Sequence, residues 1–211
     1  ILKVFLTPFS LIEGYKQGIF PMAESRDDPN IFWVSPEIRG IINLKHFIVS
    51  KSLKKIIKRE TFEIKINHDF LRIINCCAEL NYKRKDTWIN KIIIDNYTEL
   101  HKLKLAASVE CYQEEKLVGG LYGVHLGKFF FGESMFSRKS NASKIALVYL
   151  AAHLKKGGFE TLDIQYFTKH LKQFGAIQIK KEEYLRLLKK NTLRNLAFPE
   201  KLSMNVLDYF I

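Results

Sequence analysis

The chain has 211 residues, and 34 lysines and arginines against 22 aspartates and glutamates give it a formal net charge of +12. This charge predicts a polyanionic partner, whereas a hydrophobic content of 47% excludes a disordered basic tail. Three cysteines without CxxC spacing exclude a disulfide scaffold and favour a cytoplasmic location, and no apolar run reaches the roughly 18 residues that a membrane helix needs.

The first predicted helix begins with Thr7 as its cap and Pro8 in its first turn, because apolar residues then recur at helical spacing. The proline-rich segment 20–40 is predicted to be dominated by loops. Periodicity then predicts helices over 50–58, 68–80 and 90–104, and a strand over 62–66. Three strands over 107–113, 117–125 and 129–135 form a predicted antiparallel meander.

Asn141 is expected to cap the next helix, which ends at Gly157 and Gly158. Strands over 159–165 and 177–179 and helices over 168–174 and 182–190 follow. This order indicates an α+β (α/β) fold with a mixed, largely antiparallel sheet, and it is the order of the GNAT acyltransferases. We expect a small N-terminal lobe over 1–40, a GNAT-like domain over 41–190 and a C-terminal extension over 191–211.

Two acidic positions stand out in otherwise apolar segments. Glu133 lies near the end of a predicted strand, where a carboxylate needs a cation or a hydrogen-bond donor. It is therefore either functional or part of a structural salt bridge, for example with Arg138. Asp163 and Gln165 are two residues apart on a strand and point to one face, so they are a functional pair unless Asp163 caps a neighbouring loop.

Several chemistries lack their motifs. There is no catalytic serine motif, HExxH or P-loop, and the six histidines lack metal-ligand spacing. The turn at 138–142 has no glycine, which argues against coenzyme A, but its two cations still favour phosphate. Basic clusters at 51–59 and around Arg84, with Trp88 close by, favour an RNA backbone and base stacking at a single-stranded end.

A set of motifs in consistent order resembles the leucyl/phenylalanyl-tRNA–protein transferase family. The motifs are GIFPM at 18–22, FWVSP at 32–36, DTWIN at 86–90, GESMFSR at 132–138, ASK at 142–144, DIQ at 163–165, HL at 170–171 and FGA at 174–176. The resemblance implies transfer of Leu or Phe, with Met a further candidate, from aminoacyl-tRNA to the N-terminal Arg or Lys of a protein. The product is an N-degron for proteolysis. Because the donor is an activated ester, no ATP, metal or coenzyme A is needed. The protein is expected to be a monomer and to bind no membrane.

The resemblance also suggests roles for individual residues. The side-chain pocket is expected to comprise Phe130, Met135, Leu147, Leu121 and Leu162. The terminal adenosine is expected against Trp88 and Met22, where Met22 replaces a tryptophan of many relatives. Contacts to tRNA phosphates are expected from Arg138, Lys144, Lys54, Lys55 and Arg84.

The expected catalytic residues are Gln165, Asp163 and Glu133. Gln165 should orient the attacking amine rather than deprotonate it, because a carboxamide is a poor base and an α-amino group is already partly neutral at cellular pH. Asp163 should support Gln165 electrostatically, and Glu133 with Asp163 should attract a basic N-terminal residue.

Two other functions fit part of the pattern. One is a GNAT-like acyltransferase with a different amine acceptor, which a measurement of coenzyme A binding would separate. The other is a non-catalytic tRNA-binding protein, which would bind RNA whether or not it is aminoacylated and would leave Glu133, Asp163 and Gln165 without a chemical role.

Overall fold

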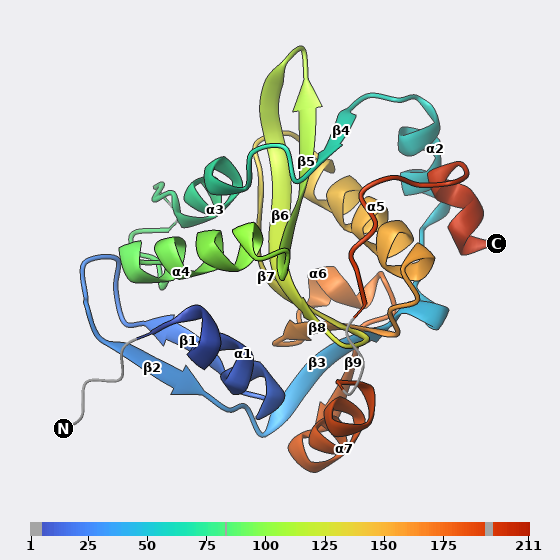
Figure 1. Cartoon of the computed structure of the whole chain (residues 1–211). Helices are drawn as coiled ribbons and strands as arrows, with labels where there is room; N and C mark the ends of the chain where they lie inside the picture. The colour runs from blue at the N-terminus through green and yellow to red at the C-terminus, as the bar shows by residue number, and fades with distance from the viewer. Residues whose placement is uncertain (1–5, 83, 193–195) are drawn as a thin grey trace.

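A computed structural model describes residues 6–82, 84–192 and 196–211 (Figure 1). Residues 6–37, called the N-terminal lobe below, begin with α1 (Pro8–Lys16), where the Thr7 hydroxyl accepts a hydrogen bond from the Ser10 amide, as a helix cap does. The lobe continues with β1 (Phe20–Ala23) and β2 (Ile31–Val34), which pair as a two-stranded antiparallel sheet. The expectation that loops dominate 20–40 is therefore wrong.

The main sheet has seven strands in the order β4-β5-β6-β7-β8-β3-β9. Their bounds are β3 (Ile38–Asn43), β4 (Glu63–Ile66), β5 (Ala106–Gln113), β6 (Lys116–Leu126), β7 (Phe129–Ser137), β8 (Thr161–Gln165) and β9 (Ile177–Lys180). All neighbours are antiparallel except β7 and β8, which run parallel. The expected fold class, an α+β fold with a mixed and largely antiparallel sheet, is confirmed.

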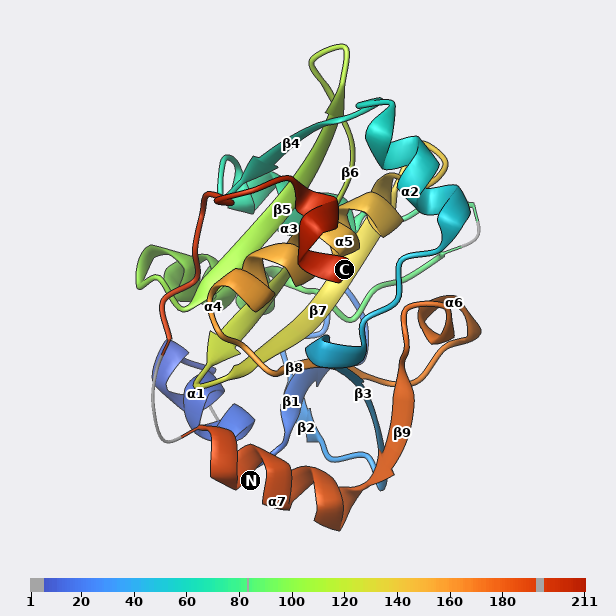
Figure 2. The same ribbon diagram turned by 90° about the vertical axis from the view of Figure 1, so that its right-hand side faces the viewer.

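Helices cover both faces of this sheet (Figures 1 and 2). One core contains side chains of α2 (Lys51–Lys58), α5 (Ala142–Lys156) and the 3-10 helices η1 (Leu44–His46) and η2 (Val206–Phe210). The other contains side chains of α1, α3 (Phe70–Ala78), α4 (Lys91–Lys102) and α7 (Lys181–Asn191). The short α6 (Lys169–Lys172) follows β8. From residue 50 to 191 every predicted helix and strand is present, with ends shifted by a few residues.

One further detail differs from expectation. Asn141 precedes α5 in a left-handed conformation, with φ at 68°, and its side chain caps nothing in the described structure. The segment 196–211 packs beside α5, because Val206, Leu207 and Tyr209 are buried in the core that this helix shares. The Phe198 ring stacks on His153, with ring centroids 5.9 Å apart, which holds this segment against the helix.

Candidate active site

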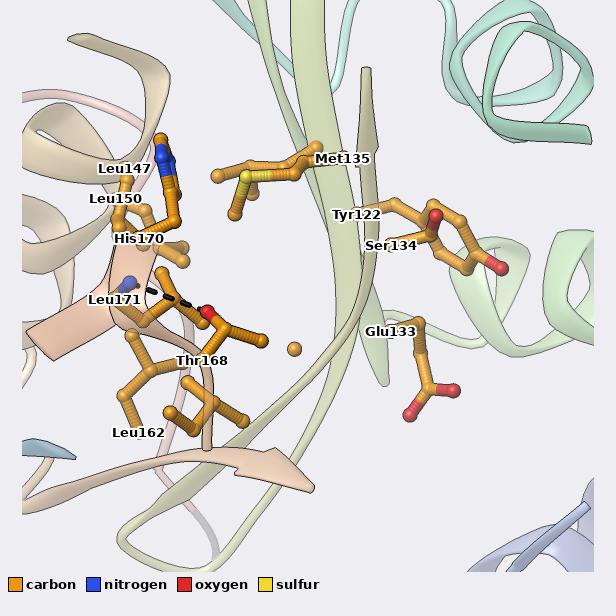
Figure 3. Close-up of a pocket in the computed structure, with 13 residues that line it drawn as sticks. Tyr122, Glu133, Ser134, Met135, Leu147, Leu150, Leu162, Thr168, His170 and Leu171 are labelled. Carbon is orange, nitrogen blue, oxygen red and sulfur yellow. Dashed lines mark hydrogen bonds between the residues drawn. The ribbon is translucent and has the colours of Figure 1, made fainter. Parts of the chain in front are cut away.

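The site lies where two neighbouring strands part. β7 and β8 pair in parallel from Phe129 with Thr161 to Phe131 with Asp163. Both strands then continue, β7 to Ser137 and β8 to Gln165, without further pairing to each other. A cavity of about 300 Å³ lies at this opening (Figure 3).

The cavity is lined mainly by apolar side chains. They are Leu121, Met135, Leu147, Leu150, Leu162, Ile164 and Leu171. Thr168 and His170 add polar groups at its margin, and the Thr168 hydroxyl accepts a hydrogen bond from the Leu171 amide (Figure 3). Burial lowers the pKa of His170, and nearby Lys144 acts in the same direction, so its imidazole is biased toward the neutral form.

Four of the five residues expected in the side-chain pocket line this cavity: Leu121, Met135, Leu147 and Leu162. Phe130 does not line it. Phe130 lies on the part of β7 that pairs with β8, opposite Leu162. Its ring is fully buried and packs against Phe198 in the core. The expectation for Phe130 is thus corrected, because it supports the pocket from within the core.

Glu133 carries a buried carboxylate on β7, with 7% of its surface exposed. The Tyr15 hydroxyl donates to its Oε1 at 2.7 Å, and the Tyr97 hydroxyl donates to its Oε2 at 3.2 Å. Burial raises the pKa of the Glu133 carboxyl to about 7, although the hydrogen bonds that it accepts act in the opposite direction. A buried acid whose pKa lies near neutrality is characteristic of functional sites.

The alternative of a salt bridge between Glu133 and Arg138 is wrong. Arg138 instead donates to both carboxylate oxygens of Glu79, at 2.6 and 2.8 Å. Figure 3 shows the Glu133 side chain pointing away from the apolar side chains of the cavity. The opening thus has an apolar side toward α5 and a polar side toward α1 and α4, from which Tyr15 and Tyr97 come.

Asp163 is fully buried on β8 and is enclosed by donors. Arg39 forms a two-pronged pair with it, with Nε to Oδ1 at 3.0 Å and Nη2 to Oδ2 at 2.8 Å. The Tyr184 hydroxyl donates to Oδ2 at 2.6 Å, and the Gln165 amide donates to Oδ1 at 2.8 Å. Because its charge is paired inside the protein, Asp163 does not present it to a basic substrate. Asp163 also accepts a hydrogen bond from the main chain two residues further on, at the end of its own strand.

Gln165 is the last residue of β8 and has a left-handed backbone, with φ at 59°. Its Nε2 lies 3.3 Å from both carboxylate oxygens of Glu133. Since Nε2 of the Gln165 carboxamide faces Glu133, its Oε1 points away from Glu133. Gln165 therefore links the strand that carries Asp163 to the buried carboxylate on β7.

The two residues expected at the adenosine come from segments that meet. Trp88 is half-buried rather than exposed, and its carbonyl accepts a hydrogen bond from the Ala23 amide at 3.2 Å. Met22, also half-buried, precedes Ala23 on β1. The structure thus brings the Trp88 segment and the N-terminal lobe together.

The expected phosphate contacts are not gathered at one place. Arg84 donates from Nη2 to the carbonyl of Cys77 at 2.6 Å and from Nε to that of Glu79 at 3.0 Å, so its guanidinium closes the end of α3. Lys54 and Lys55 lie on α2, which packs on the opposite face of the sheet. Arg138 is committed to Glu79, and Lys144 is half-buried at the start of α5. Of these five residues, Lys55 and Arg138 are exposed, and Arg138 is paired with Glu79.

Within the described ranges, no group of three or more His, Cys, Asp or Glu residues could hold a metal ion. No described helix is long and apolar enough to cross a membrane. The three cysteines are buried and free.

Four residues that donate to the carboxylates of Glu133 and Asp163 were not predicted from the sequence: Arg39, Tyr15, Tyr97 and Tyr184. Arg39 interrupts the apolar strand 38–42, and that single charge was the available signal. Tyr15 and Tyr97 sit on the apolar faces of their helices, where a tyrosine is indistinguishable from a core aromatic until its partner is known.

Comparisons with known proteins show which family the chain belongs to. A family model described as Leucyl/phenylalanyl-tRNA protein transferase matches residues 41–189, and the model of its N-terminal domain matches residues 6–37. A protein from Zymomonas mobilis named leucyl/phenylalanyl-tRNA–protein transferase is 47% identical over 203 residues, which are 96% of this chain and 76% of that protein. The chain belongs to the leucyl/phenylalanyl-tRNA–protein transferase family.

Two solved structures resemble this transferase-family chain more distantly. One is the structure of L-PGS from Bacillus licheniformis, with a TM-score of 0.49 and 14% identity over 75% of this chain and 66% of that one. The other is the C-terminal domain of a putative lysylphosphatidylglycerol synthetase from Agrobacterium fabrum, with a TM-score of 0.42 and 10% identity over 96% of this chain and 61% of that one.

Proposed function

We propose that this protein transfers Leu or Phe from aminoacyl-tRNA to the N-terminal Arg or Lys of an acceptor protein, and thereby creates an N-degron. Membership of the family makes the chain an aminoacyltransferase that uses aminoacyl-tRNA and a protein acceptor. The observation that carries the finer proposal is the strand opening, which has an apolar cavity on one side and the buried carboxylate of Glu133 on the other.

The cavity supports selection of an apolar amino acid. Its volume of about 300 Å³ can hold a Leu or Phe side chain, and its walls offer Leu, Ile and Met contacts. A charged side chain would lose its hydration there without gaining a partner, which costs several kcal/mol. An apolar pocket also separates similar side chains by size, by roughly 1–3 kcal/mol per methylene.

The tRNA end is proposed to bind beside the N-terminal lobe. The Trp88 ring would stack on the terminal adenosine, a contact worth about 1–3 kcal/mol per base. Met22 would supply a softer second contact through its thioether. The excess of positive charge would attract the tRNA phosphates, with Lys55 and Arg138 the exposed members of the expected set.

The proposed reaction forms one bond and breaks one. The α-amino nitrogen of the acceptor attacks the ester carbonyl, a C–N bond forms, and the C–O bond to the ribose breaks. The amine loses a proton and the departing ribose oxygen gains one, so no redox partner or cofactor is required. Gln165 would accept a hydrogen bond from the amine and fix its direction, which is a contribution of orientation rather than of basicity.

Glu133 would give the site its preference for a basic acceptor. Its carboxylate is ionised above a pH of about 7, and its negative charge would then attract the cationic end of the incoming chain. We place this reaction in the cytoplasm, where the buried free cysteines would remain reduced.

The deciding experiment measures transfer of radiolabelled Leu or Phe from charged tRNA to a model protein that begins with Arg or Lys, beside the same protein beginning with Ala. Transfer to the basic N-termini alone is expected. Gln165→Ala should abolish most transfer, with Gln165→Asn as the matched control that keeps a carboxamide but shortens its reach. Equal transfer to the Ala protein, or normal transfer by Gln165→Ala at saturating substrates, would contradict the proposal.

A further inference from the structure

The proposed chemistry leaves the function of Arg39 open. This side chain lies on β3, is 1% exposed and is among the largest fully buried side chains of the described protein. Burying a guanidinium group costs several kcal/mol unless the group is paired with an opposite charge and hydrogen-bonded. Its planar fork meets the Asp163 carboxylate through Nε and Nη2, a geometry that lysine cannot reproduce.

The same guanidinium also contacts the N-terminal lobe. Its Nη1 donates to the carbonyl of Gly18 at 3.2 Å, and its Cζ lies 4.8 Å from the ring centroid of Phe20. On the other side it lies 4.6 Å from the ring centroid of Tyr184 on α7. Arg39 thus joins the lobe, β3 and α7 at the carboxylate of Asp163.

Asp163 passes this constraint to Gln165. Its Oδ1 accepts both from Arg39 Nε and from the main-chain amide of Gln165, so one oxygen atom connects the two residues. Gln165 needs such support, because a non-glycine residue with φ near 59° occupies a sparsely populated conformation. The backbone of β3 also lies close to the chain that follows Gln165, because a Cβ added to Gly40 would lie only 2.8 Å from the backbone nitrogen of Phe167.

We infer that Arg39 is a positioning residue for aminoacyl transfer, because it fixes Asp163, Asp163 fixes the backbone of Gln165, and the Gln165 carboxamide is thereby held beside Glu133. This inference rests on the proposed function, which gives Gln165 its role in orienting the amine. Arg39 itself touches neither the cavity nor the acceptor, so it acts only through this sequence of contacts.

The test is a double-mutant cycle on the single-turnover rate of Leu transfer to an N-terminal Arg. Arg39→Lys keeps the charge but loses the fork, and it should lower the rate by about 10-fold to 100-fold, since a misplacement of about 1 Å can cost about 100-fold. In a Gln165→Ala background the same change should alter the rate by less than about twofold, because a residue that acts through Gln165 has nothing left to position. The Kd for aminoacyl-tRNA should stay at the wild-type value in both backgrounds.

A stability control separates positioning from general loosening. Leu188→Ala opens a cavity in the same core, on α7, and removes no side-chain hydrogen bond of Arg39, Asp163 or Gln165. Assayed well below its melting temperature, it should keep near wild-type transfer. If Arg39→Lys does not fold, Tyr184→Phe removes another donor from Asp163 and should show the same dependence on Gln165.

The inference would be overturned if the effects of Arg39→Lys and Gln165→Ala on the transfer rate multiplied in the double variant. It would also be overturned if Leu188→Ala lost as much rate as Arg39→Lys at an equal loss of stability. A wild-type protein that transfers nothing to N-terminal Arg would overturn the proposed function, and the inference with it. The wild-type rate therefore distinguishes the two failures.

Discussion

Replacing Glu133 by glutamine removes a buried carboxyl group whose ionisation is opposed by its burial. The folded protein holds this carboxyl with a pKa raised from 4.5 to about 7, whereas the unfolded chain has the lower value. Between these two values the folded state binds more protons than the unfolded state. The contribution of Glu133 to the stability of the wild-type protein therefore falls as the pH rises through this window.

The magnitude follows from the same two values. Each pKa unit corresponds to about 1.4 kcal/mol, so a rise from 4.5 to about 7 makes the ionised carboxyl cost roughly 3 kcal/mol of folding stability at pH 8. Glu133→Gln has no such group. The difference in the free energy of unfolding, variant minus wild type, should increase by about 2 to 3 kcal/mol between pH 5 and pH 8.

Urea denaturation of both proteins at pH 5, 6, 7 and 8 measures this difference. Histidines and other titrating groups contribute equally to both proteins, so their effects cancel in the subtraction. The absolute stability of the variant depends on the hydrogen bonds between the side-chain amide that replaces the carboxylate and the Tyr15 and Tyr97 hydroxyls. This contribution to the free energy of unfolding does not change with pH. A difference that stays constant from pH 5 to pH 8 would refute the conclusion that the interior opposes ionisation of Glu133.

Three further predictions follow from the same geometry. Tyr15→Phe removes a hydrogen-bond donor from the Glu133 carboxylate, and hydrogen bonds to charged groups are worth about 1.5–3 kcal/mol. The acidic limb of the pH profile of kcat/KM for transfer should therefore move up by about one pH unit. An unmoved limb would mean that another group titrates. Leu147→Phe reduces the cavity, so transfer of Phe should fall about 10-fold more than transfer of Leu in parallel assays, and an equal loss for both would argue against this cavity as the side-chain pocket. Phe198→Ala removes the ring stacked on His153 and should cost about 3 kcal/mol in urea denaturation while leaving the transfer rate at pH 7 unchanged; a loss under about 1 kcal/mol would show that the segment is weakly held.

Local patterns in the sequence were sufficient for most of the fold. The strands of the meander are mainly apolar segments bounded by turns, and the helices carry apolar residues at a period near 3.6. Each could therefore be assigned without knowing its neighbours. The hairpin of β1 and β2 was not recognised because three prolines suggested loops. Pro21 lies within β1 itself, paired with Trp33 in a sheet of only two strands, where one missing amide is tolerated.

The site was only partly predictable for a different reason. Glu133, Asp163 and Gln165 stood out because a polar residue in an apolar strand needs an explanation. Their partners could not be assigned, because Arg39 is 124 residues from Asp163 and Tyr15 is 118 residues from Glu133. Such pairs are fixed by sheet order and lobe packing, which periodicity does not encode.

The separation of β7 and β8 has a consequence for how such a pocket can change over evolutionary time. Met135 lines the cavity from β7 beyond the last parallel pair of the two strands, and Leu147 lines it from α5. Their side chains can therefore grow or shrink without disturbing the hydrogen bonds between β7 and β8. The carboxylates and their partners are anchored separately, on the opposite side of the opening. The size of the accepted amino acid and the geometry of bond formation can therefore drift independently, which leaves such a scaffold free to acquire new apolar substrates while its reaction stays the same.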